Sequence, residues 1–169
     1  FLIISCKNTL FLKKLNRNPH FCLLLLLETI NIILMRGIFV EKFGGASVNS
    51  ATSIKNVISI LQLDEKARVV VVSAMGKTTN SLEKIVDLWY RFTRFNQEEF
   101  DFIKAYHISI VKELFENTSA LDIALSMVED IFLDLKQNLL SLNPKDYDFL
   151  YDSIVSYGEK ISTAILSLY

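Results

Sequence analysis

Residues 37–48 read GIFVEKFGGASV, an apolar run that ends abruptly in two adjacent glycines. The run predicts a β-strand over 37–43. Two glycines are unfavourable inside a regular element, because glycine loses the most backbone freedom on folding. They suit a tight turn, or a loop whose backbone comes close to a bound anion. Lys42 and Ser47 flank the glycines and offer a positive charge and a hydroxyl to such an anion.

A second strand is predicted over 67–74, ARVVVVSA, with a helix over 50–63 between the two strands. The continuous β-branched run is typical of a strand that is covered on both faces, as in a parallel sheet. Ser50 is placed to cap the intervening helix. Strand, helix and strand together form a βαβ unit with a right-handed crossover, so the sequence predicts the α/β class.

The rest of the chain is predicted to be helical. The expected helices cover 81–92, 98–116, 120–142 and 145–169, and Pro144 opens the last of them. In helix 98–116, His107 shares an apolar face with Ile103 and Val111. A histidine on such a face is expected to be packed and hydrogen-bonded rather than catalytic.

The composition is that of an ordinary globular domain with room for one sizeable core: 169 residues, 51% hydrophobic, with a net charge of −1. A charge so near zero gives no reason to expect nucleic acid or an anionic membrane as a partner. Cys6 and Cys22 both lie near the start, and His20 and His107 are far apart. Neither a disulfide framework nor a thiolate or zinc site is therefore indicated.

The first 34 residues differ from the remainder and contain five consecutive leucines, Leu23–Leu27. One interpretation is a signal peptide, but Glu28 interrupts the apolar segment and no small-residue cleavage site follows it. The segment is also too short and too polar for a membrane span. We favour upstream sequence translated in frame, with the natural protein beginning at Met35, because the α/β pattern starts directly after that residue.

Small, polar residues follow both predicted strands. They read KFGGAS over 42–47 and SAMGKTTN over 73–80. Ligands of an open α/β sheet bind outside the carboxyl ends of its strands, so these loops are candidates for holding phosphate. Thr79 and Asn80 add the free N–H groups of a helix start. Neither loop is a Walker or GxGxxG motif, and a tight turn or a simple helix cap remains an alternative.

A third motif, SYGEKIST over 156–163, lies in the last predicted helix. Gly158 inside a helix costs about 1 kcal/mol relative to alanine, which indicates that another group approaches closely. Glu159 falls off the apolar stripe and shares a face with Ser162 and Thr163. A solvated surface glutamate is the alternative.

Together the motifs resemble those of the aspartate kinases of the amino-acid kinase superfamily. KFGGASV at 42–48 is similar to the family signature KFGGTSV, SAMGKTTN at 73–80 to SAMGxTTN, and SYGEKIS at 156–162 to S-x-GE-x-x-S. The resemblance runs over 35–169. Ala46 departs from the usual threonine or serine, which removes a hydroxyl but no charge. The resemblance implies a three-layer αβα sandwich with a mainly parallel sheet, incomplete at the carboxyl end.

The implied reaction transfers the γ-phosphoryl group of ATP to the β-carboxylate of L-aspartate, the first step toward lysine, threonine and methionine. By motif position, Lys42 matches the lysine that contacts the ATP phosphates and acts catalytically. Gly44, Gly45 and Ser47 match the phosphate-binding loop. Mg²⁺ is expected to accompany ATP, with no metal-ligating residue in this segment. A cytoplasmic homo-oligomer is the expected form of the parent enzyme.

Ser73, Thr79 and Glu159 match family positions that hold aspartate, with Glu159 able to meet its α-ammonium group. The family's later GRGGSD stretch, most of its adenine site and its ACT domains are not in this sequence. We therefore expect the N-terminal part of a kinase domain that is inactive by itself. The alternatives are a related amino-acid kinase, acting on glutamate, carbamate or a nucleotide, and a non-enzymatic remnant.

Overall fold

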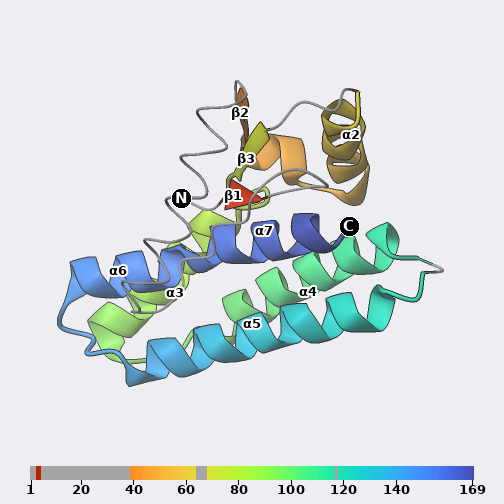
Figure 1. Ribbon diagram of the computed structural model, residues 1–169. Coiled ribbons are helices and arrows are strands. Elements are labelled where there is room, and N and C mark those ends of the chain that lie inside the picture. Colours follow the sequence, from red (N-terminus) through yellow and green to blue (C-terminus); the bar gives the residue numbers. More distant parts are fainter. Residues whose placement is uncertain (1–2, 5–38, 64–67, 117) are drawn as a thin grey trace, which may run out of the picture.

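The structure is a computed structural model that describes residues 3–4, 39–63, 68–116 and 118–169 (Figure 1). Its elements are, in chain order, β1 (Ile3–Ile4), β2 (Phe39–Phe43), the 3₁₀ turn η1 (Gly45–Val48), α2 (Ala51–Leu61), β3 (Arg68–Val72), α3 (Thr78–Phe92), α4 (Gln97–Leu114), α5 (Leu121–Ser141), α6 (Tyr147–Val155) and α7 (Tyr157–Leu168). The predicted extension 1–34 lies outside the described residues, apart from the two that form β1.

The small sheet confirms the predicted pairing of β2 with β3. The two strands are parallel and are joined through α2, with Lys42 opposite Val71 and Phe43 opposite Val72. β1 pairs antiparallel with the other edge of β3, which places Ile3 opposite Val71. No residue of β3 is exposed, as expected for a strand covered on both faces.

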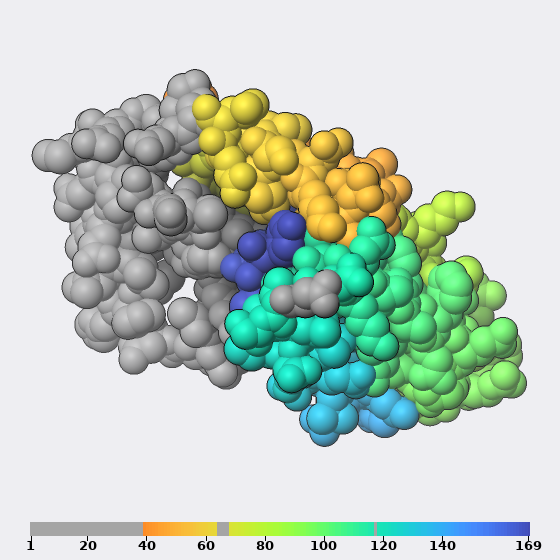
Figure 2. Space-filling model, turned by 90° about the vertical axis from the view of Figure 1, so that its right-hand side faces the viewer, coloured from red at the N-terminus to blue at the C-terminus, as the bar shows by residue number. Residues whose placement is uncertain are grey.

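Most of the described protein is helical. Figure 1 shows α3 to α7 packed together beneath the sheet, with α2 beside it. α7 contacts β3 and α2 contacts α4, so the βαβ unit packs against the helical part at two places. Figure 2 shows the segment from β2 to α2, in orange and yellow, lying directly on the green surface of α4.

The apolar faces predicted for α4 and α7 form the core of this helical layer. On α4 the buried residues include Ile103, His107 and Val111. On α7 they include Ile161 and Ile165. In the described ranges, none of the helices has the length and apolar character that crossing a bilayer requires.

Two predicted helix boundaries were wrong. α3 begins at Thr78 rather than at residue 81, because the Thr78 hydroxyl donates to the Met75 carbonyl at 2.6 Å and closes the first turn. The single helix predicted over 145–169 is two helices, α6 and α7. The break occurs at Ser156, whose amide bonds to the Ile154 carbonyl and so leaves the regular ladder. Gly158 consequently lies in the first turn of α7, not in a helix interior.

Candidate functional site

The glycine loop, residues 44–49, leaves β2 through the turn η1. The Gly76 amide donates to the Gly45 carbonyl at 3.1 Å. A Cβ at Gly45 would lie 2.5 Å from the Ala74 carbonyl oxygen, whereas a Cβ at Gly44 would meet nothing within 4 Å. Glycine is therefore required at the second position by the close approach of another loop, and not at the first.

The second loop, residues 73–77, follows β3. The Ser73 amide donates to the Phe43 carbonyl at 3.1 Å, which continues the pairing of the two strands. Gly76 has φ of +54°, a left-handed conformation that favours glycine. The paired glycines also form a tight turn, η1, but the left-handed glycine is Gly76.

α7 supplies the third part of the site. A Cβ at Gly158 would lie 2.7 Å from the Ala74 Cβ, which confirms that the glycine marks a close approach. The next residue, Glu159, is half-buried, and its Oε1 accepts from the Ala74 amide at 3.4 Å. Its position in the first turn of α7 is favourable for a carboxylate, because the amino end of a helix carries partial positive charge.

The three motifs therefore meet at Ala74, a residue for which the sequence predicted no role. Its carbonyl oxygen faces Gly45, its methyl group faces Gly158, and its amide faces Glu159. This small side chain lets two loops and the start of a helix come together. A larger residue at this position would separate them.

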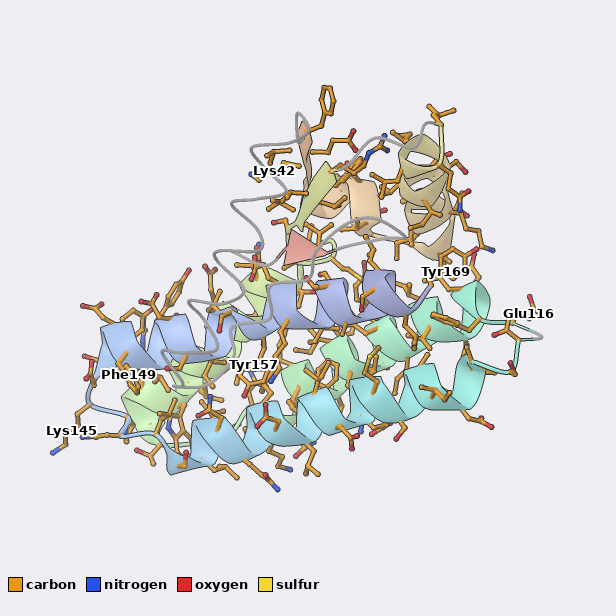
Figure 3. All side chains as sticks on the ribbon, in the orientation of Figure 1. Lys42, Glu116, Lys145, Phe149, Tyr157 and Tyr169 are labelled. Atoms are coloured by element: carbon orange, nitrogen blue, oxygen red, sulfur yellow. The ribbon has the colours of Figure 1, made fainter. Side chains whose placement is uncertain are left out.

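The remaining predicted site residues lie on β2, on η1, directly after β3 and in the first turn of α3. Lys42 and Ser47 are exposed, while Ser73 and Thr79 are half-buried. Figure 3 shows Lys42 on the sheet, apart from the helical layer. In the described part of the chain, neither Lys42 nor Ser47 forms a side-chain hydrogen bond or ion pair with another predicted site residue. Both side chains remain accessible to a ligand outside the carboxyl end of β2.

A buried support behind the second loop was missed in the sequence. The Thr78 hydroxyl lies 3.3 Å from Nε2 of His107, whose Nδ1 lies 2.7 Å from the Ile103 carbonyl oxygen. Burial lowers the pKa of His107 to about 4, so the ring is neutral near pH 7. The predicted packed and hydrogen-bonded histidine is confirmed, and the helical spacing that placed it on the apolar face was the signal available. No pattern in the sequence indicated that Thr78 would be the partner of His107.

In the described ranges, no group of three or more His, Cys, Asp or Glu side chains is placed to hold a metal ion.

The chain belongs to the amino acid kinase family, whose family model matches residues 37–169. Its curated relatives include two chloroplastic aspartokinases of Arabidopsis thaliana. Aspartokinase 1 is 39% identical over 136 residues, which are 77% of this chain and 23% of that protein. Aspartokinase 2 is 36% identical over 136 residues, which are 77% of this chain and 24% of that protein. The chain spans about a quarter of the length of these relatives.

Crystal structures of E. coli aspartokinase III have a similar fold. The T-state complex with lysine and aspartate has a TM-score of 0.59 and 26% identity, covering 76% of this chain and 28% of that one. The R-state complex with aspartate and ADP has a TM-score of 0.56 with the same identity and coverage. These similarities confirm the aspartate kinase resemblance and the α/β class.

A matched pair of substitutions tests the steric requirement at the glycine loop. Gly45→Ala is expected to destabilise the protein by about 1–3 kcal/mol, because the new methyl group overlaps the backbone of the second loop. Gly44→Ala is expected to leave stability unchanged or to raise it by up to about 1 kcal/mol, because Gly44 has φ of −77° and open space around it. Thermal unfolding of the two variants measures the difference, and equal midpoints would contradict the loop contact.

Proposed function

We propose that this chain is the N-terminal part of an aspartate kinase domain. The complete kinase transfers the γ-phosphoryl group of ATP to the β-carboxylate of L-aspartate. The observation that supports this assignment is the meeting of the three motifs at Ala74, where Gly45, Gly158 and Glu159 converge. Both similar E. coli structures hold aspartate, and the R-state structure also holds ADP, which agrees with these substrates.

The donor side of the proposed site is built from β2 and the glycine loop. Lys42 lies one residue before the end of β2, is exposed, and carries a mobile positive charge for the ATP phosphates. No atom outside Gly44 and its chain neighbours lies within 4 Å of the position that a Cβ of Gly44 would take, so a phosphate can come close to the backbone N–H groups of this loop. Gly45 and Ser47 complete this phosphate-binding loop. Phosphoryl transfer requires mainly positioning and charge stabilisation, which these groups supply.

The acceptor side is built from the second loop and the first turn of α7. Ser73 and Thr79 offer hydroxyl groups, and Glu159 offers a carboxylate for the α-ammonium group of aspartate. The β-carboxylate is already ionised at neutral pH, so no general base is needed to activate it. This agrees with the role of His107 as a buried structural side chain.

Several finer features belong to the same proposal. The complete domain is a three-layer αβα sandwich with a mainly parallel sheet, and the complete enzyme is a homo-oligomer. Mg²⁺ enters with ATP, and the product leads toward lysine, threonine and methionine. The cytoplasmic location remains a prediction, whereas the Arabidopsis relatives are chloroplastic.

Acceptor specificity tests the proposal. The complete kinase that contains these residues is incubated with ATP, Mg²⁺ and one acceptor at a time, and the acyl phosphate is trapped with hydroxylamine. Turnover is expected with aspartate and not with glutamate, carbamate or a nucleoside monophosphate. Turnover with one of those acceptors instead of aspartate would assign a related amino-acid kinase. Lack of turnover with every acceptor would favour the non-enzymatic remnant.

The 169-residue chain alone is expected to give no turnover in the same assay. In-line transfer requires donor and acceptor in a near-attack geometry, and this chain supplies the acceptor side and a single phosphate loop. ATP- and aspartate-dependent turnover by the isolated chain would show that no further segment is needed.

A further inference from the structure

Tyr106 and His107 are neighbours on α4, and each contacts a different part of the candidate site. The Tyr106 hydroxyl donates to the carbonyl of Asn49, the last residue of the glycine loop, at 2.7 Å. The same oxygen lies 2.8 Å from the position that a Cβ of Gly76 would take, so it also covers the turn of the second loop. The His107 ring reaches Thr78, where the second loop enters α3.

The protons of the His107 contact can be assigned from chemistry. Nδ1 lies 2.7 Å from the Ile103 carbonyl, which can only accept, so Nδ1 carries the hydrogen. The neutral ring then leaves Nε2 as an acceptor. The Thr78 hydroxyl lies within 3.3 Å of Nε2 and also within 2.6 Å of the Met75 carbonyl. The single proton of the Thr78 hydroxyl is therefore shared between the Met75 carbonyl in the second loop and His107 on α4.

This contact lies where water cannot replace it. His107 is 0% exposed and Thr78 is 2% exposed. A buried polar atom without a partner is costly, so the pair opposes movement of the α3 start away from α4. The Tyr106 bond to Asn49 is exposed, so Tyr106 restrains the glycine loop through one short hydrogen bond rather than through burial. Because both side chains come from one rigid helix, α4 defines the separation of the two loops.

We propose that Tyr106 and His107 are positioning residues that hold the glycine loop and the second loop at the separation required for phosphoryl transfer. This inference rests on the proposed function, because it assigns the two loops to donor and acceptor. Neither residue touches a substrate in this assignment. A misplacement of about 1 Å can slow such a reaction by about 100-fold, so a support outside the site is able to control its rate.

The kinetic test compares substitutions that keep or remove single contacts in the complete kinase. His107→Asn keeps a donor for Ile103 but does not reach Thr78, whereas His107→Gln can extend an amide oxygen to the position of Nε2. Thr78→Val removes the hydroxyl with little change of shape. His107→Asn and Thr78→Val are expected to lower kcat by about 10-fold or more, and His107→Gln by no more than about twofold. The double variant, which combines His107→Asn with Thr78→Val, is expected to lose no more kcat than either single variant.

A second matched pair tests the other residue. Tyr106→Phe removes the bond to Asn49 and is expected to lower kcat by about 10-fold. Tyr151→Phe removes a bond of the same length, 2.7 Å, which joins α6 to Glu83 on α3 and involves neither loop. It is expected to retain the kcat of the unsubstituted kinase. Equal losses from the two substitutions, or equal rates for His107→Asn and His107→Gln, would overturn the inference.

Hydrogen exchange provides a readout that does not depend on activity. The Gly76 amide is bonded to the Gly45 carbonyl and so reports on the contact between the loops. Exchange in peptides covering 73–80 is expected to be about 10-fold faster in Tyr106→Phe and His107→Asn, with α6 unchanged. An equal increase in α6, or no increase in either region, would contradict the positioning role. A kinase without turnover on aspartate would contradict the proposed function, and the exchange comparison would still decide the positioning role.

Discussion

Replacing Lys42 with alanine in the complete kinase is expected to lower kcat by about 100- to 1,000-fold, the usual effect of removing one group that stabilises transition-state charge. Lys42 is exposed beside the glycine loop, where the transferring phosphoryl group is proposed to lie. A charge that acts mainly in the transition state affects kcat more than the substrate KM.

The fold is expected to survive this substitution. An exposed lysine can be truncated without leaving a buried partner, so the thermal unfolding midpoint is expected to change little. Lys55→Ala is the matched control, because Lys55 is also exposed but lies on α2. The measurement is the initial rate at saturating ATP and aspartate, with thermal unfolding of both variants. A near-normal kcat for Lys42→Ala would remove this lysine from the site.

Replacing Glu159 with alanine is expected to raise the KM for aspartate by about 10- to 100-fold, because a hydrogen bond between charged groups contributes about 1.5–3 kcal/mol. The KM for ATP is expected to stay within about twofold, since the glycine loop that holds ATP is not altered. The bond that Glu159 accepts from the Ala74 amide is long, at 3.4 Å, so its loss is expected to disturb the second loop only slightly.

A matched control separates this effect from a general loss of negative charge. Glu113→Ala removes a carboxylate from an exposed position on α4, and both KM values are expected to be unchanged. Substrate titrations of the two variants, each with the other substrate saturating, provide the comparison. If Glu159→Ala raised both KM values equally, Glu159 would be a structural residue and not the partner of the aspartate ammonium group.

The sequence predicted those elements whose signals are local. Ser50 caps α2 as expected, by accepting from the Ser53 amide at 3.1 Å. The β-branched run became β3, and the apolar spacing placed His107 on the buried face of α4. In each case a residue within about four positions, or a regular period, carried the information. The motif residues were therefore identifiable before their positions in space were known.

The errors arose where a local pattern was interrupted by a contact between segments. The spacing over 145–169 continues through Ser156, so sequence periodicity alone could not show the break between α6 and α7. That break lets Gly158 lie against Ala74, because α7 begins just before it. Similarly, the early start of α3 depends on Thr78, whose hydroxyl is oriented by a loop carbonyl and by α4.

What the sequence by itself determined is the class of fold, the residue types of the site and the resemblance that relates them to aspartate kinases. What only the tertiary structure decided is which of these residues meet. Ala74 and Glu159 are 85 positions apart, Asn49 and Tyr106 are 57 apart, and Thr78 and His107 are 29 apart. Caps and periodic patterns act within a turn or two of the chain, whereas such distant pairs form only when whole elements pack. The packing of α4 and α7 against the two loops thus assembles the site.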